Sequence, residues 1–202
     1  CFLLAFFAAI GFLSKYLFIY LLISISLLFS YFIFFKKSKK FDFKYLIIIE
    51  IFIILLVPHL IWLYDNEFIT IFYGLKRASL VESNLIDHIN YPITFLLKQI
   101  VLLLPFLFLI WLLTKKFKFK VNLKDKKLIF LFFVNIIPIF LIFITSVIAG
   151  SKIRTMWMAP FYLFFGLFFV YLFRSKININ KIDSFLKGFI FLFFLSPILY
   201  SL

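Results

Sequence analysis

The sequence has little of what soluble enzymes and metalloproteins depend on. It has a single cysteine, Cys1, so no disulfide can form within the chain, and one cysteine with two histidines does not make a zinc site. The five glycines are scattered, so neither the dinucleotide-binding fingerprint nor a phosphate-binding loop can be built from them. We therefore expect no metal and no cofactor.

Acidic residues are also scarce, with 8 Asp and Glu against 22 Lys and Arg and a net charge of +14. A strongly basic chain can bind nucleic acid, but here the basic residues lie in short clusters that directly flank apolar runs. That arrangement is typical of the cytoplasmic loops of membrane proteins. We therefore expect no nucleic-acid partner.

Apolar residues dominate what is present. Of 202 residues, 66% are hydrophobic and 24% are aromatic, and the mean hydropathy is +1.18. Soluble domains have only about 45–50% apolar residues. Several runs approach the ~20 residues that a helix needs to cross a bilayer, so the sequence predicts an all-α, polytopic transmembrane helix bundle of about six to seven spans. We find no linker or repeat and expect a single transmembrane domain over residues 1–202.

The expected spans follow one another along the chain at residues 16–35, 45–64, 92–113, 128–149 and 156–173, with shorter apolar runs at 1–13 and 189–202. The first run is too short to cross a bilayer at ~1.5 Å per residue. It has no basic segment before it, which disfavours a signal peptide. Together with the start at Cys1, this indicates part of a longer protein.

Charge predicts which ends of these spans are cytoplasmic. The loops after the spans at 16–35, 92–113 and 156–173 hold 16 Lys and Arg, against 6 on the other side. Lysine-rich loops stay in the cytoplasm, so we expect a multi-pass membrane protein with the long loop Asp65–Tyr91 outside. This loop should be partly helical and packed on the membrane surface, because it carries apolar anchors at Phe68, Ile69, Ile71, Phe72, Leu75 and Leu80.

Three cations from separate segments should meet on the outer side: Lys15, Arg77 and Arg154. Ammonium and guanidinium groups hold phosphate by charge-assisted hydrogen bonds, so we expect them to bind the phosphate of a lipid ligand. Contact with ordinary membrane lipid headgroups is the alternative explanation. Asp65 and Glu67 are weak candidates for a general base, since a nearby apolar wall raises a carboxyl pKa. Acids are also simply tolerated outside the membrane.

Four stretches resemble a known family: GFLSKY at 11–16, PHLIWLYDNEF at 58–68, YPITFLLKQ at 91–99 and RTMWMAPFY at 154–162. They are similar to the polyprenyl- or dolichyl-phosphate-sugar-dependent glycosyltransferases of the GT-C class, which include protein mannosyltransferases and lipid A aminoarabinose transferases. The resemblance places Lys15 in the family's leucine–serine–lysine step, Trp62 at the entry to the outer loop, and Trp157 and Pro160 at the start of a later helix. It implies a substrate pocket containing His59, Trp62 and Trp157.

The resemblance implies transfer of a sugar from a polyprenyl-phosphate donor to an acceptor on the outer face of a bacterial inner membrane, which the protein would cross several times. The family's catalytic acid lies in the first outer loop, which has no counterpart in this chain, so an upstream portion of the same enzyme is implied as a partner. One alternative is a non-enzymatic transporter or lipid flippase, which is disfavoured by the sparse charge within the spans. Another is an inactive, decayed fragment.

Overall fold

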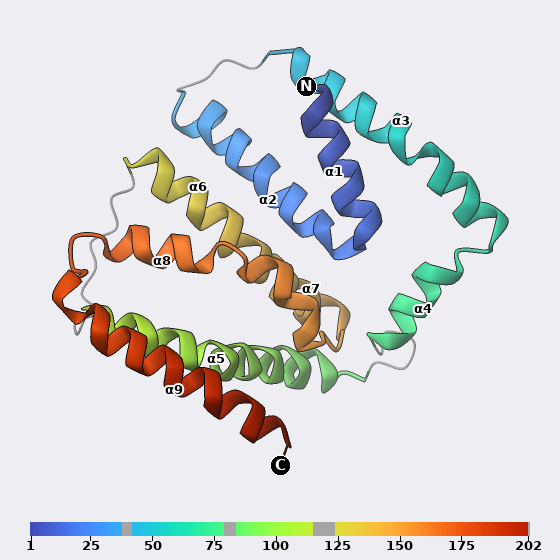
Figure 1. Cartoon of the computed structure of the whole chain (residues 1–202). Coiled ribbons are helices and arrows are strands. Elements are labelled where there is room, and N and C mark those ends of the chain that lie inside the picture. The colour runs from blue at the N-terminus through green and yellow to red at the C-terminus, as the bar shows by residue number, and fades with distance from the viewer. Residues whose placement is uncertain (38–41, 79–83, 115–123, 202) are drawn as a thin grey trace.

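The structure is a computed structural model that describes residues 1–37, 42–78, 84–114 and 124–201. Within these ranges every regular element is helical (Figure 1). The α-helices are α1 (Phe2–Ser14), α2 (Ile19–Ser30), α3 (Lys44–Asp65), α4 (Ile69–Arg77), α5 (Asp87–Thr114), α6 (Lys126–Asn135), α7 (Ile137–Ala149), α8 (Phe165–Phe173) and α9 (Ile182–Ser201). Short 3₁₀ turns are η1 (Tyr16–Phe18), η3 (Thr155–Tyr162) and η4 (Ile179–Lys181), and η2 (Tyr31–Phe35) is a π-helical end of α2.

Four helical segments are long and apolar enough to cross a membrane: Tyr16–Phe35, Tyr45–Asp65, Asp87–Thr114 and Lys126–Ala149. The pair Thr155–Tyr162 and Phe165–Phe173, bent by 53°, makes a fifth if it is one span. This confirms the all-helical class and agrees with a multi-pass membrane protein. The expected six to seven spans are not confirmed, since the described residues provide four or five, and α1 is one of the shorter apolar helices.

The loop predicted between residues 65 and 91 is shorter than expected. Helix α3 continues through Asp65, and α5 begins at Asp87, whose side-chain carboxylate accepts a hydrogen bond from the backbone N–H of Asn84 at 2.9 Å. The predicted helical part is confirmed as α4. Leu80, one of the expected anchors, lies outside the described residues, as do the inner-loop lysines Lys39, Lys40, Lys115, Lys116, Lys118 and Lys120.

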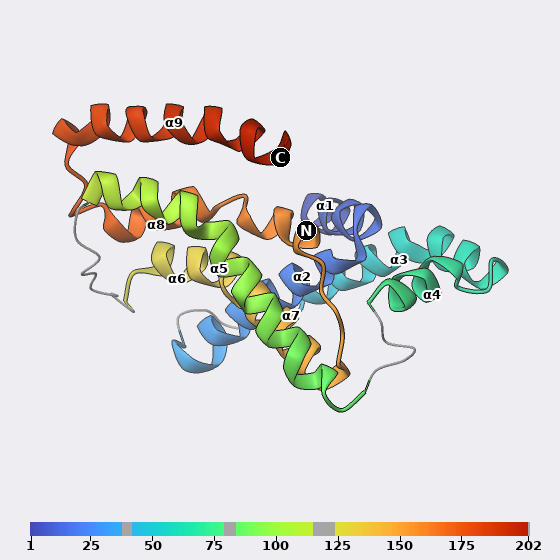
Figure 2. The ribbon, with the colours of Figure 1, turned by 90° about the horizontal axis from the view of Figure 1, so that it is seen from below.

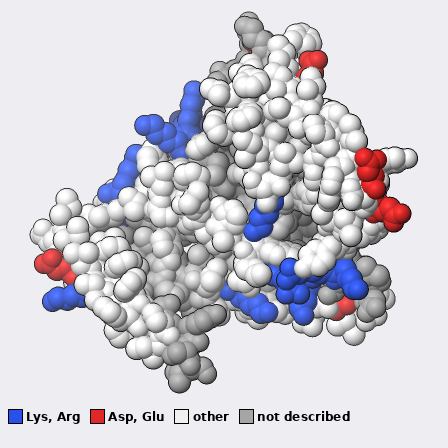
Figure 3. All heavy atoms as spheres, turned by 45° about the vertical axis from the view of Figure 1, so that its right-hand side comes forward, with Lys and Arg blue, Asp and Glu red and all other residues white. Residues whose placement is uncertain are grey.

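The helices pack as neighbouring pairs. Helix α1 lies on α3, where Ala5 and Ala9 are fully buried, because small side chains let two helices approach closely. Helix α5 packs on α7 and on α9, and α6 packs on α8 (Figures 1 and 2). Most of the face in Figure 3 is uncharged, and Lys and Arg gather in a few separate groups, as expected of a surface that faces lipid.

The described residues of the three lysine-rich loops, which follow the spans at 16–35, 92–113 and 156–173, lie at one end of the bundle. We call this end the lysine end. There the carboxylate of Asp125 caps α6 by accepting from the backbone N–H of Lys127 at 3.0 Å. It also accepts from the Tyr171 hydroxyl at 2.7 Å and pairs with Arg174 at 3.4 Å, which ties α6 to α8. The hydrogen bond from Tyr171 is the main cause that lowers the pKa of Asp125.

The opposite end gathers the segments that the sequence placed outside the membrane. The backbone N–H of Lys152 donates to the carbonyl oxygen of Ala78 at 2.8 Å, which joins the turn after α7 to the end of α4. A ring nitrogen of His88 lies 2.9 Å from the carbonyl oxygen of Val147, which joins α5 to α7. Two of the segments predicted to lie on the outer side, residues 65–91 and the turn after α7, are therefore in contact.

Candidate functional site

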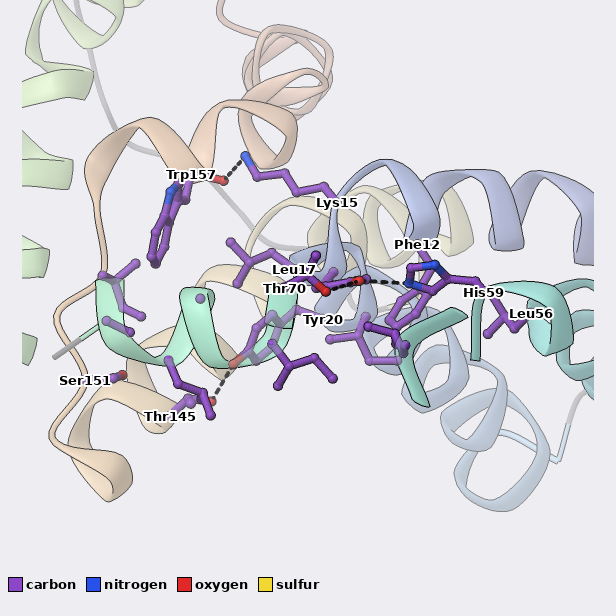
Figure 4. A pocket seen from close by; sticks show the side chains of 18 of the residues that line it. Phe12, Lys15, Leu17, Tyr20, Leu56, His59, Thr70, Thr145, Ser151 and Trp157 are labelled. Carbon is purple, nitrogen blue, oxygen red and sulfur yellow. Dashed lines mark hydrogen bonds between the residues drawn. The ribbon is translucent and has the colours of Figure 1, made fainter. Parts of the chain in front are cut away.

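A cavity of about 590 Å³ lies at the end of the bundle opposite the lysine end. Its wall is built by the junction of α1 and η1, the start of α2, the last turns of α3, helix α4, and the chain from the end of α7 into η3 (Figure 4). Most of the lining side chains are apolar, including Leu17, Leu56, Leu60, Leu63, Leu75 and Ile153. A cavity of this size and character suits an apolar ligand with a few polar groups.

Lys15 reaches this cavity because the backbone changes direction at this residue. It ends α1 in an extended conformation, with φ −160° and ψ 114°, and η1 begins at the next residue. Its side chain is half-buried, and its ammonium donates to the carbonyl oxygen of Trp157 at 3.0 Å. Burial lowers the pKa of Lys15 from its ordinary value of 10.5.

The charge of Lys15 is not balanced by a carboxylate in the part of the chain that the structure describes. It is also the one formally charged side chain among the cavity-lining residues described. A half-buried ammonium in apolar surroundings favours a negative group beside it, because an opposite charge restores what it loses with its hydration. The cavity therefore has a point that attracts an anion.

A second polar group of the cavity joins three segments. The Nε2 atom of His59 on α3 lies 2.8 Å from the hydroxyl oxygen of Tyr16, which lies 3.0 Å from the Thr70 hydroxyl on α4 (Figure 4). The Trp62 ring stacks on His59 with a centroid separation of 5.9 Å and an interplanar angle of 12°. This chain of contacts holds α4 against η1 and α3 and so closes one side of the cavity.

A third polar group lies at the end of α7. The hydroxyl of Tyr20 on α2 donates to Thr145 at 3.0 Å, and the Thr145 hydroxyl donates to the carbonyl of Leu141 at 3.0 Å. Ser151, in the turn that follows α7, also lines the cavity. The sequence analysis missed these residues. The only signal for them was a hydroxyl group within or beside an apolar run.

The predicted pocket residues divide between the cavity and its outside. Lys15, His59 and Trp157 line the cavity. Trp62 is not among the lining residues and is exposed, and its ring stacks on the ring of His59. The structure thus brings together three residues that lie on three separate segments of the chain.

The other predicted site residues lie outside the cavity wall. The Arg77 guanidinium lies over the Tyr73 ring, 5.4 Å from its centroid, and donates to the Tyr73 hydroxyl at 3.1 Å. Arg154 is exposed and precedes η3. Asp65 and Glu67 are exposed at the turn between α3 and α4. None of these four lines the cavity, and their predicted roles stay predictions.

No protein family model, curated protein or solved structure matches this chain. The interpretation of the cavity therefore depends on its own residues and on the sequence pattern around it. Of the four stretches that carry the family resemblance, three contribute to the cavity wall: Lys15 and Tyr16 from the first, His59 from the second and Trp157 from the last.

Proposed function

We propose that this chain is part of a membrane glycosyltransferase that binds a polyprenyl-phosphate-linked sugar in this cavity. The observation that carries the proposal is Lys15: an ammonium without a carboxylate partner in the described residues, set in the wall of an otherwise apolar cavity. A polyprenyl phosphate offers an apolar chain for the apolar wall and an anion for Lys15. The sugar in this proposal comes from the family resemblance of the four stretches.

The packing of the third stretch of resemblance, residues 91–99, supports the proposal. Within residues 91–99, Phe95 is buried in one cluster with Met158 and Phe161 of residues 154–162. The Tyr162 hydroxyl donates to the buried side chain of Gln99. This stretch therefore lies behind the cavity and positions η3, whose Trp157 carbonyl holds Lys15.

The proposed reaction is transfer of a glycosyl group. The oxygen of an acceptor hydroxyl forms a bond to the anomeric carbon of the sugar, and the bond from that carbon to the phosphate oxygen breaks. The electron pair leaves with the lipid phosphate, and a carboxylate base takes the acceptor proton. Lys15 stabilises the negative charge that develops on the leaving phosphate, the type of electrostatic help that usually contributes most to catalysis. Asp65 and Glu67 remain the candidate bases within this chain.

The proposal places the protein in a bacterial inner membrane, with the cavity at the outer leaflet and the lysine end in the cytoplasm. The excess of Lys and Arg in the loops of the lysine end supports this orientation. The position of the cavity supports this too, since it lies beside the ends of α3 and α7, each of which ends a candidate span.

A labelled donor tests the proposal. Membranes that contain the protein receive a polyprenyl phosphate carrying a radiolabelled sugar, together with an extract that supplies acceptors and any further portion of the enzyme. We expect label to leave the donor, free polyprenyl phosphate to accumulate, and Lys15→Met to abolish both. Movement of intact donor between leaflets without loss of sugar would instead identify a flippase. If the donor neither loses its sugar nor moves between leaflets, both activities are contradicted.

A further inference from the structure

The far wall of the cavity holds a polar atom that nothing in the described protein satisfies. Ser151 lines the cavity and is only 2% exposed, and its hydroxyl oxygen has no hydrogen-bond partner among the described residues. A buried hydroxyl without a partner costs free energy, and such groups are rare in folded proteins. In the wall of a cavity, such a hydroxyl is a candidate contact for a ligand.

The position of Ser151 is fixed by its own backbone. Gly150 turns the chain in the left-handed region, with φ 60°, directly after α7. The Ser146 hydroxyl then donates to the carbonyl oxygen of Ser151 at 2.7 Å, which holds the turn against the last turn of the helix. Ser151 is therefore held beside the end of α7, where Thr145 also lines the cavity.

Tyr20 adds a third hydroxyl group to this part of the cavity wall. Its hydroxyl donates its hydrogen to Thr145, so its oxygen lone pairs remain as acceptors. The Ser151 hydroxyl has a hydrogen to donate. The corner, defined here as Tyr20, Thr145 and Ser151, thus offers both a donor and an acceptor.

No formally charged side chain of the described cavity lining lies in this corner, because Lys15 is on a different part of the wall (Figure 4). The neighbouring Lys152 is turned toward the Tyr91 ring, with its nitrogen 5.9 Å from the ring centroid. A phosphate only accepts hydrogen bonds and favours cations. A neutral hydroxyl both donates and accepts, which is what this corner provides.

We propose that the corner of Tyr20, Thr145 and Ser151 is a binding site for a neutral hydroxyl-bearing group, namely the sugar of the lipid-linked donor, and that Lys15 binds the phosphate separately. This inference rests on the proposed function and deepens it. It assigns sugar recognition to hydroxyl groups on α2 and at the end of α7.

Two probes separate the sites: farnesyl phosphate, and farnesyl phosphate that carries glucose on its phosphate. Their dissociation constants are measured for the protein in lipid nanodiscs. We expect Ser151→Ala to weaken binding of the glucosylated probe about 2- to 10-fold, as for the loss of one ordinary hydrogen bond, and to leave farnesyl phosphate unchanged. Tyr20→Phe should have the same selective effect.

Ser26→Ala is the matched control, because Ser26 is exposed on α2 and its hydroxyl donates to the Leu22 carbonyl of the same helix. Thermal stability gives a second measurement. Ser151→Ala should leave it unchanged or raised in the absence of probe, since the hydroxyl it removes has no partner. A clear loss of stability would contradict the unsatisfied state of that hydroxyl and overturn the inference.

The outcomes distinguish the two proposals. If both probes bind the wild type and Ser151→Ala changes neither, or weakens both equally, the sugar site is wrong while the proposed function stands. If neither probe binds the wild type, the proposed function is wrong and the sugar site falls with it.

Discussion

The ammonium nitrogen of Lys15 lies 3.0 Å from the carbonyl oxygen of Trp157, 142 residues further along the chain. This contact joins the first polar step of the sequence to the segment that begins the bent pair of helices, and both residues line one cavity. Because the partner is a backbone carbonyl and not a carboxylate, the positive charge of Lys15 remains available to an anion.

The lowered pKa of Lys15 gives the binding of farnesyl phosphate a characteristic pH dependence. Only the protonated ammonium attracts the phosphate, and burial lowers the pKa of the free protein below 10.5. Affinity should therefore be full at neutral pH and fall as the pH rises through that lowered pKa. Titration of the dissociation constant between pH 7 and pH 10.5 checks this.

Lys15→Arg is the control for this titration, because a guanidinium stays protonated throughout the range. The arginine variant should keep a flat profile even if its affinity differs from that of the wild type. An equally steep fall in both proteins would place the titrating group elsewhere.

Filling the cavity should block the ligand. Gly74 on α4 lines the cavity, and a Cβ atom added there meets no other atom within 4 Å. Gly74→Leu should therefore fit the helix, which leucine favours over glycine by about 0.8 kcal/mol, yet weaken farnesyl phosphate by roughly 10-fold or more through lost volume. Binding and thermal stability are measured on the same nanodisc preparation.

Gly166→Leu on α8 is the matched control, since an added Cβ also meets nothing within 4 Å and Gly166 does not line the cavity. It should leave binding unchanged. Equal binding by Gly74→Leu and the wild type would show that the ligand does not occupy this cavity.

The buried contact between Tyr162 and Gln99 predicts a clear pattern of stability. Gln99 is 4% exposed, and its side-chain nitrogen has no partner among the described residues. Tyr162→Phe would leave the amide oxygen without its donor too, and should cost about 1–3 kcal/mol of unfolding free energy. The double variant Gln99→Leu/Tyr162→Phe removes both partners and should recover most of that loss.

Unfolding in mild detergent, measured for both single variants and the double variant, gives the coupling between the two residues. If the losses of the single variants simply add in the double variant, the two side chains do not interact in the folded protein.

The orientation of the protein in the membrane is tested by cysteine labelling. In a background that carries Cys1→Ser, we introduce Asn84→Cys, before α5, or Lys176→Cys, at the lysine end; both positions are exposed. An impermeant maleimide should label the first in intact cells and the second only after the cells are opened. The reverse pattern would invert the topology and remove the outer-face reaction.

Much of the helical framework was predictable because it depends on run length and charge. The apolar runs predicted α3 within a residue at each end, and the polar stretch after it predicted a helix where α4 lies. The start of α5 was predicted at Pro92, five residues after its true start at Asp87, because the polar residues before Pro92 look like ordinary loop sequence.

The cavity itself was only partly predictable. Lys15 stands out as a cation beside an apolar run, and the resemblance drew attention to His59 and Trp157. Lipid-facing and cavity-facing residues look alike in one sequence, so nothing separated Tyr20 or Ser151 from other hydroxyls. Arg77 was expected beside Lys15 from topology alone, which fixes the membrane side of a residue but not the direction of its side chain.

The most direct test of the account is the affinity of farnesyl phosphate, compared with farnesol, for the wild type and for Lys15→Met. The account predicts that Lys15→Met weakens farnesyl phosphate about 10- to 100-fold, the loss of one charge-assisted hydrogen bond, and leaves farnesol unchanged. Lys187→Met on α9, away from the cavity, should change neither. Equal affinity of the wild type and Lys15→Met for farnesyl phosphate would contradict the phosphate site.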